Sequence, residues 1–218
     1  MRKTILALAV LATVLTSCQP KFTINGSVSN LESNMVYLKE IKDNLPVTID
    51  SAKVIDNKFE FTGSTDITKR CFLFENNKTK RPIAEIYIEN TNLAIELDVK
   101  KPQEIKITGG KAQLVVNKFN TIQDSLNSSI QILNNRYMAL VPQKETLAEK
   151  FDIEIEKIRD DYKKLIENAQ QEEKTLIEAN LSSVVAADKF RNISRTMKLK
   201  ERKEFINKFT GEAAKCPS

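Results

Sequence analysis

The pattern of hydrophobic and polar positions changes near residue 110 and divides the chain into two halves. From Phe22 to Thr108, apolar residues alternate with polar ones, and turn residues separate the runs. A period of two is typical of strands with one buried face. About eight short strands are therefore predicted, around residues 22–28, 36–38, 47–54, 59–61, 72–74, 86–88, 93–97 and 105–107.

The turns between these strands favour a small antiparallel β-sandwich or barrel. Asp56-Asn57 predicts a tight turn, because Asn tolerates a left-handed backbone. The polar segment 76–82 ends in Pro82, which predicts an exposed hairpin tip. Gly109-Gly110 ends the series of strands.

After Gly110 the apolar residues recur every three or four positions, which indicates helices. The first helix should end before Pro142, since proline disfavours helical geometry in the residue that precedes it. A second helix is expected from about residue 144 to 179, and its roughly 35 residues at about 1.5 Å each give a rod of roughly 50 Å. Its apolar steps of four and three form a heptad seam. The two apolar faces favour an antiparallel hairpin, and a homodimeric coiled coil is the alternative.

Two shorter helices are expected at residues 181–190 and 199–209, with Gly211 as a cap and a frayed tail after it. The predicted fold class is α+β: an N-terminal antiparallel β-sandwich or barrel, then a C-terminal helical hairpin and short helices. The expected segments are a lipoprotein signal peptide (1–17), a lipidated tether (18–21), a β-rich domain (22–112), a helical domain (113–210) and a disordered tail (211–218).

The N-terminus predicts export and attachment to a membrane. Arg2 and Lys3 precede the apolar run 5–15, which is too short for a comfortable membrane span and is typical of a secretory signal. The ending Leu15-Thr16-Ser17-Cys18 resembles the lipobox of bacterial lipoproteins, in which a peptidase cuts before the lipidated cysteine. We therefore expect cleavage between Ser17 and Cys18, with acyl chains on Cys18. One acyl chain anchors marginally, and two or three hold firmly.

The residue after the cleavage site bears on localisation. Gln19 stands where Asp would signal retention in the inner membrane of enteric bacteria. The expectation is an outer-membrane anchor. No acidic tether follows Cys18, which favours the periplasmic face.

The composition argues against several classes of functional site. The chain contains no His, the commonest general base and zinc ligand, so the usual serine-hydrolase and papain-like triads cannot form. The formal charge of +5 includes Arg2 and Lys3, and bases alternate with acids, so no nucleic-acid footprint is expected. No metal, cofactor or catalytic residue is predicted.

Short motifs in the strand-rich half carry a family resemblance. They are Ile24-Asn25-Gly26-Ser27-Val28, Val36-Tyr37-Leu38, Ile49-Asp50-Ser51-Ala52-Lys53-Val54, Lys58-Phe59-Glu60-Phe61-Thr62-Gly63, Ile86-Tyr87-Ile88-Glu89 and Ile105-Lys106-Ile107-Thr108-Gly109. In order and spacing these motifs resemble the domain of unknown function 4369, over roughly residues 22–118. That β-rich domain is typical of Bacteroidota lipoproteins, where it commonly precedes a helical linker and a thioredoxin-like domain. No Trp-Cys-x-x-Cys signature follows here, so the resemblance assigns redox activity to no residue of this chain.

Two further kinds of site are candidates. Cys71 and Cys216 would pair as a disulfide in an oxidising compartment if geometry allowed, and the alternative is a buried Cys71 and a free Cys216. Asp50-Ser51-Ala52 and Asp124-Ser125-Leu126 resemble the Asp-Ser-aliphatic acceptor for O-glycosylation in the same phylum, which makes Ser51 and Ser125 candidate acceptors. A structural role in a local turn is the alternative for Asp50 and Ser51.

The sequence leaves three functions open. The first is a non-catalytic binding or scaffold module, held on a membrane by its lipid, with a protein partner in the envelope. The second, motivated by the resemblance, is a truncated or accessory component of a thiol–disulfide oxidoreductase system, with a thioredoxin-like partner. The third is a carrier for a small ligand in an apolar cavity of the β-domain, which has only the fold class in its favour.

Overall fold

A computed structural model describes residues 21–43, 45–76 and 81–216. The predicted signal peptide, its cleavage site and Cys18 lie outside these residues, as does most of the predicted hairpin tip. Within the described ranges, no helix combines the length and the apolar character needed to cross a bilayer.

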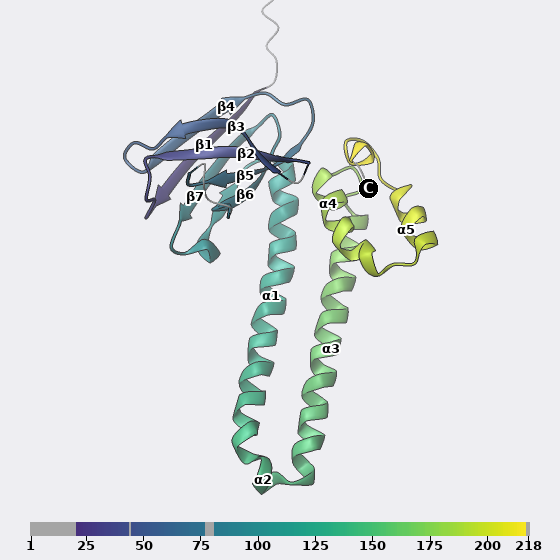
Figure 1. The fold of residues 1–218 in the computed structure, drawn as a ribbon. Coiled ribbons are helices and arrows are strands. Elements are labelled where there is room, and N and C mark those ends of the chain that lie inside the picture. Colours follow the sequence, from purple (N-terminus) through teal and green to yellow (C-terminus); the bar gives the residue numbers. More distant parts are fainter. Residues whose placement is uncertain (1–20, 44, 77–80, 217–218) are drawn as a thin grey trace, which may run out of the picture.

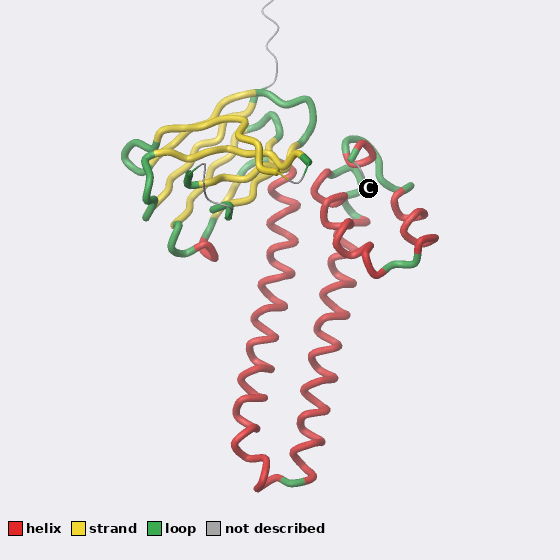
Figure 2. Tube along the Cα trace, in the orientation of Figure 1, coloured by secondary structure: helices red, strands yellow, loops and turns green. Residues whose placement is uncertain are grey.

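The N-terminal half folds into two four-stranded sheets (Figures 1 and 2). One sheet has the strand order β4-β1-β7-β8 and the other has the order β3-β2-β5-β6. The strands are β1 (Phe22–Ser29), β2 (Met35–Lys42), β3 (Leu45–Lys53), β4 (Lys58–Gly63), β5 (Lys69–Phe74), β6 (Ala84–Ile88), β7 (Asn92–Asp98) and β8 (Lys106–Thr108). The predicted strand-rich half is thus confirmed.

Alternation of side chains builds the sandwich core. In β1 the residues Phe22, Ile24 and Val28 are buried, and the polar residues between them face outward. Sixteen residues contributed by both sheets form a single buried cluster, which includes Cys71. The tight turn at Asp56-Asn57 is confirmed: both residues have positive φ, and Ile55 and Lys58 exchange two backbone hydrogen bonds across it.

One strand pair departs from the antiparallel arrangement that the sequence predicts. β1 pairs with β7 in parallel, with Ile24 beside Leu93 and Val28 beside Leu97. The other strand pairs are antiparallel. The chain visits the second sheet twice between β1 and β7, so no hairpin turn fixes their relative direction.

Two long helices form the predicted hairpin. α1 (Lys111–Leu140) and α3 (Glu149–Glu178) pack side by side and project away from the sandwich (Figure 1). Each has 30 residues, which corresponds to about 45 Å at about 1.5 Å per residue. The second predicted helix is interrupted: α2 (Lys144–Leu147) ends at Ala148, whose φ of 45° is incompatible with a continuous helix.

Two short helices follow α3 at the end of the hairpin that is nearest the sandwich (Figure 1). They are α4 (Val184–Ile193) and α5 (Leu199–Ile206). α5 ends at Ile206, so Gly211 does not cap it; with a φ of 56°, Gly211 turns the chain back instead. The tail, for which fraying is expected, folds through residue 216, with a 3-10 turn at Ala213–Lys215 and a buried Ala213.

Specific contacts attach the helices to the sandwich. Tyr87 of β6 points out of the sandwich core and lies in the helical cluster with Phe119, Ile177 and Val185. At the start of α1, the Glu89 carboxylate accepts a hydrogen bond of 2.9 Å from the backbone N–H of Ala112. A carboxylate at this position satisfies a free N–H group and favours the positive end of the helix dipole.

Candidate functional site

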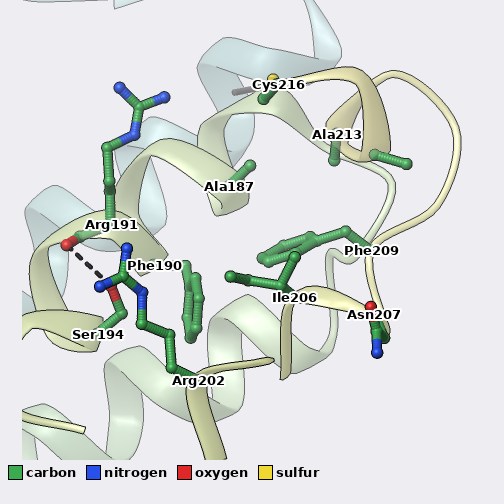
Figure 3. A pocket seen from close by; sticks show the side chains of 11 residues that line it. Ala187, Phe190, Arg191, Ser194, Arg202, Ile206, Asn207, Phe209, Ala213 and Cys216 are labelled. Carbon is green, nitrogen blue, oxygen red and sulfur yellow. Dashed lines mark hydrogen bonds between the residues drawn. The ribbon is translucent and has the colours of Figure 1, made fainter. Parts of the chain in front are cut away.

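The C-terminal helices enclose a cavity of about 350 Å³, which we call the C-terminal cavity (Figure 3). Its walls come from α4, from α5 and from the folded tail. The lining residues are Ala187, Phe190, Arg191, Ser194, Arg202, Ile206, Asn207, Phe209, Ala213, Ala214 and Cys216. Phe190, Ser194 and Ala213 are buried, whereas Asn207 and Ala214 are exposed, so the cavity has a buried floor and an exposed rim.

An aromatic cluster gives the cavity its apolar floor. Phe190 stacks on Phe205, with ring centroids 4.4 Å apart and an angle of 13° between the planes. Phe209 meets Phe190 edge to face, with centroids 5.5 Å apart. Aromatic pairs of this kind contribute about 0.5–1.5 kcal/mol of stability beyond the free energy gained by burying their area. The floor is therefore held together independently of any ligand.

The folded tail closes the cavity through one backbone contact. The N–H of Thr210 donates to the carbonyl of Leu181 at 3.0 Å, and Gly211 then reverses the chain. A second contact ties the tail to the sandwich, because the Glu212 carboxylate accepts a hydrogen bond of 3.0 Å from the N–H of Thr68. The cavity therefore depends on the folded tail, which contacts Leu181 after the hairpin and Thr68 in the sandwich.

Two arginines stand on one side of the cavity, near Ser194 (Figure 3). Arg191 Nη2 lies 3.0 Å from Asp188 Oδ1, so that charge is compensated. Arg202 is half-buried, and its guanidinium has no hydrogen bond or ion pair with the described side chains. Ser194 Oγ donates its hydrogen to the Arg191 carbonyl at 3.1 Å, which leaves its oxygen available only as an acceptor.

Asp188 connects this side of the cavity to the sandwich. Besides Arg191, it binds Tyr87, whose hydroxyl donates to Asp188 Oδ2 at 3.1 Å. Tyr87 is 1% exposed. Burial, with a further contribution from the Asp188 carboxylate, raises the pKa of Tyr87, so its hydroxyl stays protonated and keeps this hydrogen bond at neutral pH.

The segment that forms this cavity carries a surplus of positive charge, although bases alternate with acids elsewhere along the chain. Residues 184–216 contain nine Lys or Arg and four Asp or Glu, a net charge of +5. This equals the formal charge of the whole chain. The surrounding potential therefore favours anions.

The two candidate disulfide cysteines are free thiols in different clusters. Cys71 is buried in the sandwich core, and Cys216 is half-buried at the C-terminal cavity. Burial, with a smaller contribution from Glu40, raises the pKa of the Cys71 thiol to about 12. Burial also raises the pKa of Cys216. Both groups are thus thiols, not thiolates, at neutral pH.

The two candidate glycosylation serines are exposed. Ser51 lies on β3, the edge strand of its sheet, where its N–H donates to Asp50 Oδ1 at 2.7 Å. Asp50 and Ser51 both pair with β2 inside this strand, so the contact is made in a strand and not in a turn. Ser125 lies on α1, facing the groove beside α3. Both stay candidate acceptors, and neither contributes to the C-terminal cavity.

No motif in the sequence singles out Arg191, Ser194 or Arg202. The cavity also lies among the helices and not in the β-domain, where a ligand cavity was considered. A signal was present in the sequence: the basic surplus of residues 184–216 appears as soon as charge is counted by segment. The contribution of Gly211 and the tail was not visible, because fraying was expected there.

The architecture defines an α+β protein with a two-sheet sandwich followed by a long helical pair and short helices. Residues 22–115 match the family described as Domain of unknown function (DUF4369), so the chain carries a DUF4369 domain over that range. The match contains the sandwich and the first residues of α1; the C-terminal cavity lies beyond it. No curated protein matches the chain.

Proposed function

We propose that this protein is an envelope lipoprotein, anchored to the outer membrane through lipid on Cys18 and facing the periplasm, that acts as a non-catalytic binding and scaffold module. The observation that carries the binding role is the C-terminal cavity, whose lining combines the half-buried Arg202 with an aromatic floor. A concave site that combines an apolar floor with a few polar groups is a usual form of ligand site.

Support for the anchor comes from the sequence. A positive start, an apolar run and Leu15-Thr16-Ser17-Cys18 together form the pattern of a lipoprotein signal. The first strand starts at Phe22, directly after the proposed tether of residues 18–21. A short tether would hold the sandwich close to the membrane, with the helical hairpin available to a protein partner.

A role in thiol–disulfide chemistry is the second candidate, and the thiols argue against it. Exchange requires a thiolate, and the pKa values of Cys71 and Cys216 are both raised by burial. A thioredoxin-like protein remains a proposed partner, which would contact the surface of the module without exchanging disulfides with it.

The anchor predicts a defined mass for the protein isolated from its own membrane. We expect a chain that lacks residues 1–17 and carries two or three acyl chains, because one chain alone anchors marginally. Intact-mass spectrometry measures this directly. The Cys18→Ala variant should lack the acyl mass and leave the washed membrane fraction. An unlipidated wild-type chain would disprove the anchor.

The binding role predicts that a small molecule travels with the protein. Native mass spectrometry of the full-length protein, released from its own membrane, should show an added mass that returns chemically unchanged after denaturation. Ala187→Leu places a larger side chain in the C-terminal cavity and should remove that mass, whereas Ala94→Leu on β7, away from the cavity, should keep it. A wild-type protein without bound mass, or a converted molecule, would contradict non-catalytic binding.

A further inference from the structure

We propose that the C-terminal cavity binds a small monoanionic carboxylate with an apolar or aromatic body. This inference rests on the proposed binding function and adds the chemical class of the ligand.

The electrostatics of the cavity favour a single negative charge. Arg191 is already paired with Asp188. The Asp188 carboxylate also accepts a hydrogen bond from the Tyr87 hydroxyl, so Asp188 is held from two sides. Of the two arginines that line the cavity, Arg202 is the one without a partner among the described side chains. A partly buried cation without a counterion gains most from one anionic group placed against it.

The available hydrogen-bond donors favour a carboxylate. The planar guanidinium of Arg202 presents parallel N–H groups that match the two oxygens of a carboxylate. Ser194 has its hydrogen directed to the Arg191 carbonyl and cannot donate to the same anion without breaking that bond. A doubly charged group such as a phosphate monoester would need a second cation without a counterion, and the other arginine of the lining, Arg191, is already paired with Asp188.

The rest of the lining favours an apolar body. Phe190, Phe209 and Ile206 contribute rings and a branched chain, and Ala187 and Ala213 leave room beside them. A volume of about 350 Å³ is at the small end of ligand pockets, which run from about 300 to 1,000 Å³. The cavity therefore suits a single small molecule and not a peptide. An aromatic ring would lie against the edge-to-face pair of Phe190 and Phe209.

The test uses 3-phenylpropionate as the probe and its uncharged analogue, 3-phenylpropionamide, as the comparison. Each is titrated by calorimetry into the full-length lipidated protein in nanodiscs, with empty nanodiscs subtracted to remove partitioning into lipid. We expect the carboxylate to bind at least about tenfold more tightly than the amide, because the Arg202 guanidinium then pairs with a full negative charge shared by two acceptor oxygens, whereas the amide offers one uncharged carbonyl. Equal affinities, or no binding of the carboxylate, would overturn the assignment.

Two variants that each lose one positive charge distinguish binding at Arg202 from attraction by the overall positive charge of the region. Arg202→Gln should weaken 3-phenylpropionate about tenfold or more. Arg195→Gln removes the same charge from an exposed residue outside the lining and should change the affinity less than twofold. Equal losses in both variants would show that only the overall field attracts the anion. Circular dichroism checks that both variants keep the helical content of the parent.

The outcome can be distinguished from failure of the binding function itself. If native mass spectrometry shows a bound molecule that 3-phenylpropionate does not displace at saturating concentration, the protein is a binding module but the ligand class is wrong. If no molecule is retained, the proposed binding function fails as well, and the ligand class fails with it when 3-phenylpropionate does not bind. Displacement of the bound molecule by the carboxylate and not by the amide supports both.

Discussion

Gly109→Ala is expected to lower the free energy of unfolding by about 3 kcal/mol, which would make it one of the most damaging single-methyl changes in the chain. Gly109 has a φ of 92°, a conformation that costs an L-residue about 1–3 kcal/mol. A Cβ there would also overlap the backbone carbonyl of Asn92 at the start of β7. Relieving a backbone overlap adds about 1–3 kcal/mol.

Gly211→Ala is the matched control for this prediction. Gly211 also has a positive φ, of 56°, but the nearest atom to its Cβ would be the Ser182 Cβ at 3.5 Å, an ordinary contact. Its cost should therefore be about 1–2 kcal/mol, the strain of the left-handed backbone alone. Urea unfolding followed by circular dichroism measures both changes. Equal losses in the two variants would show that the overlap with Asn92 is relieved without cost.

The position of Gly109 explains why this change should affect more than local stability. It ends the sandwich immediately before α1, and the following residue, Gly110, is the N-cap of that helix. A shift of the backbone there would move Ala112 away from the Glu89 carboxylate that caps the helix. The direction in which the helical hairpin leaves the sandwich therefore depends on two glycines and one carboxylate.

The sequence predicts this junction well because the signal is local. Alternation with a period of two stops and a helical period begins within a few residues of Gly110. The turn at Asp56-Asn57 is predictable for the same reason, since a left-handed pair of residues is fixed by its own side chains. Strand identity, helix pairing and these turns follow from neighbours in the chain.

The order of the strands could not be predicted in the same way. Alternation of buried and exposed residues is the same in parallel and antiparallel strands, so nothing in β1 or β7 indicates that they run in the same direction. Their pairing depends on the paths of two segments, β2–β3 and β5–β6, which belong to the second sheet and lie between β1 and β7 in the sequence. That is a property of the whole domain and not of any short segment.

The C-terminal cavity was missed because its walls come together through contacts between distant residues. Arg202 and Phe190 lie on different helices, and the tail closes over them only through Thr210 and Gly211. A polar tail after a glycine is usually frayed, so its burial is decided by tertiary packing that overrides the local preference. Charge counted by segment was the one sequence signal for the region.

The free energy of unfolding is expected to fall by about 4 kcal/mol as the pH rises from 9 to 12, because of Cys71 alone. Burial raises the pKa of this thiol from an ordinary value of 9.0 to about 12. Between these values the unfolded chain loses the thiol proton and the folded chain keeps it, so unfolding releases a proton and becomes easier as pH increases. Three pKa units at about 1.4 kcal/mol each give this figure as an upper value.

Cys71→Val isolates the contribution of that thiol, since valine keeps an apolar group of similar size in a strand position. Urea midpoints measured between pH 7 and 11 should decline less steeply in this variant than in the parent. Tyr87→Phe should also flatten the decline, because the raised pKa of Tyr87 has the same sign, although it gives up the hydrogen bond to Asp188 at every pH. Asp50→Asn, an exposed change on β3, should leave the slope unaltered. A Cys71→Val variant with the parent slope would show that the sandwich opens locally and ionises this thiol before the protein unfolds.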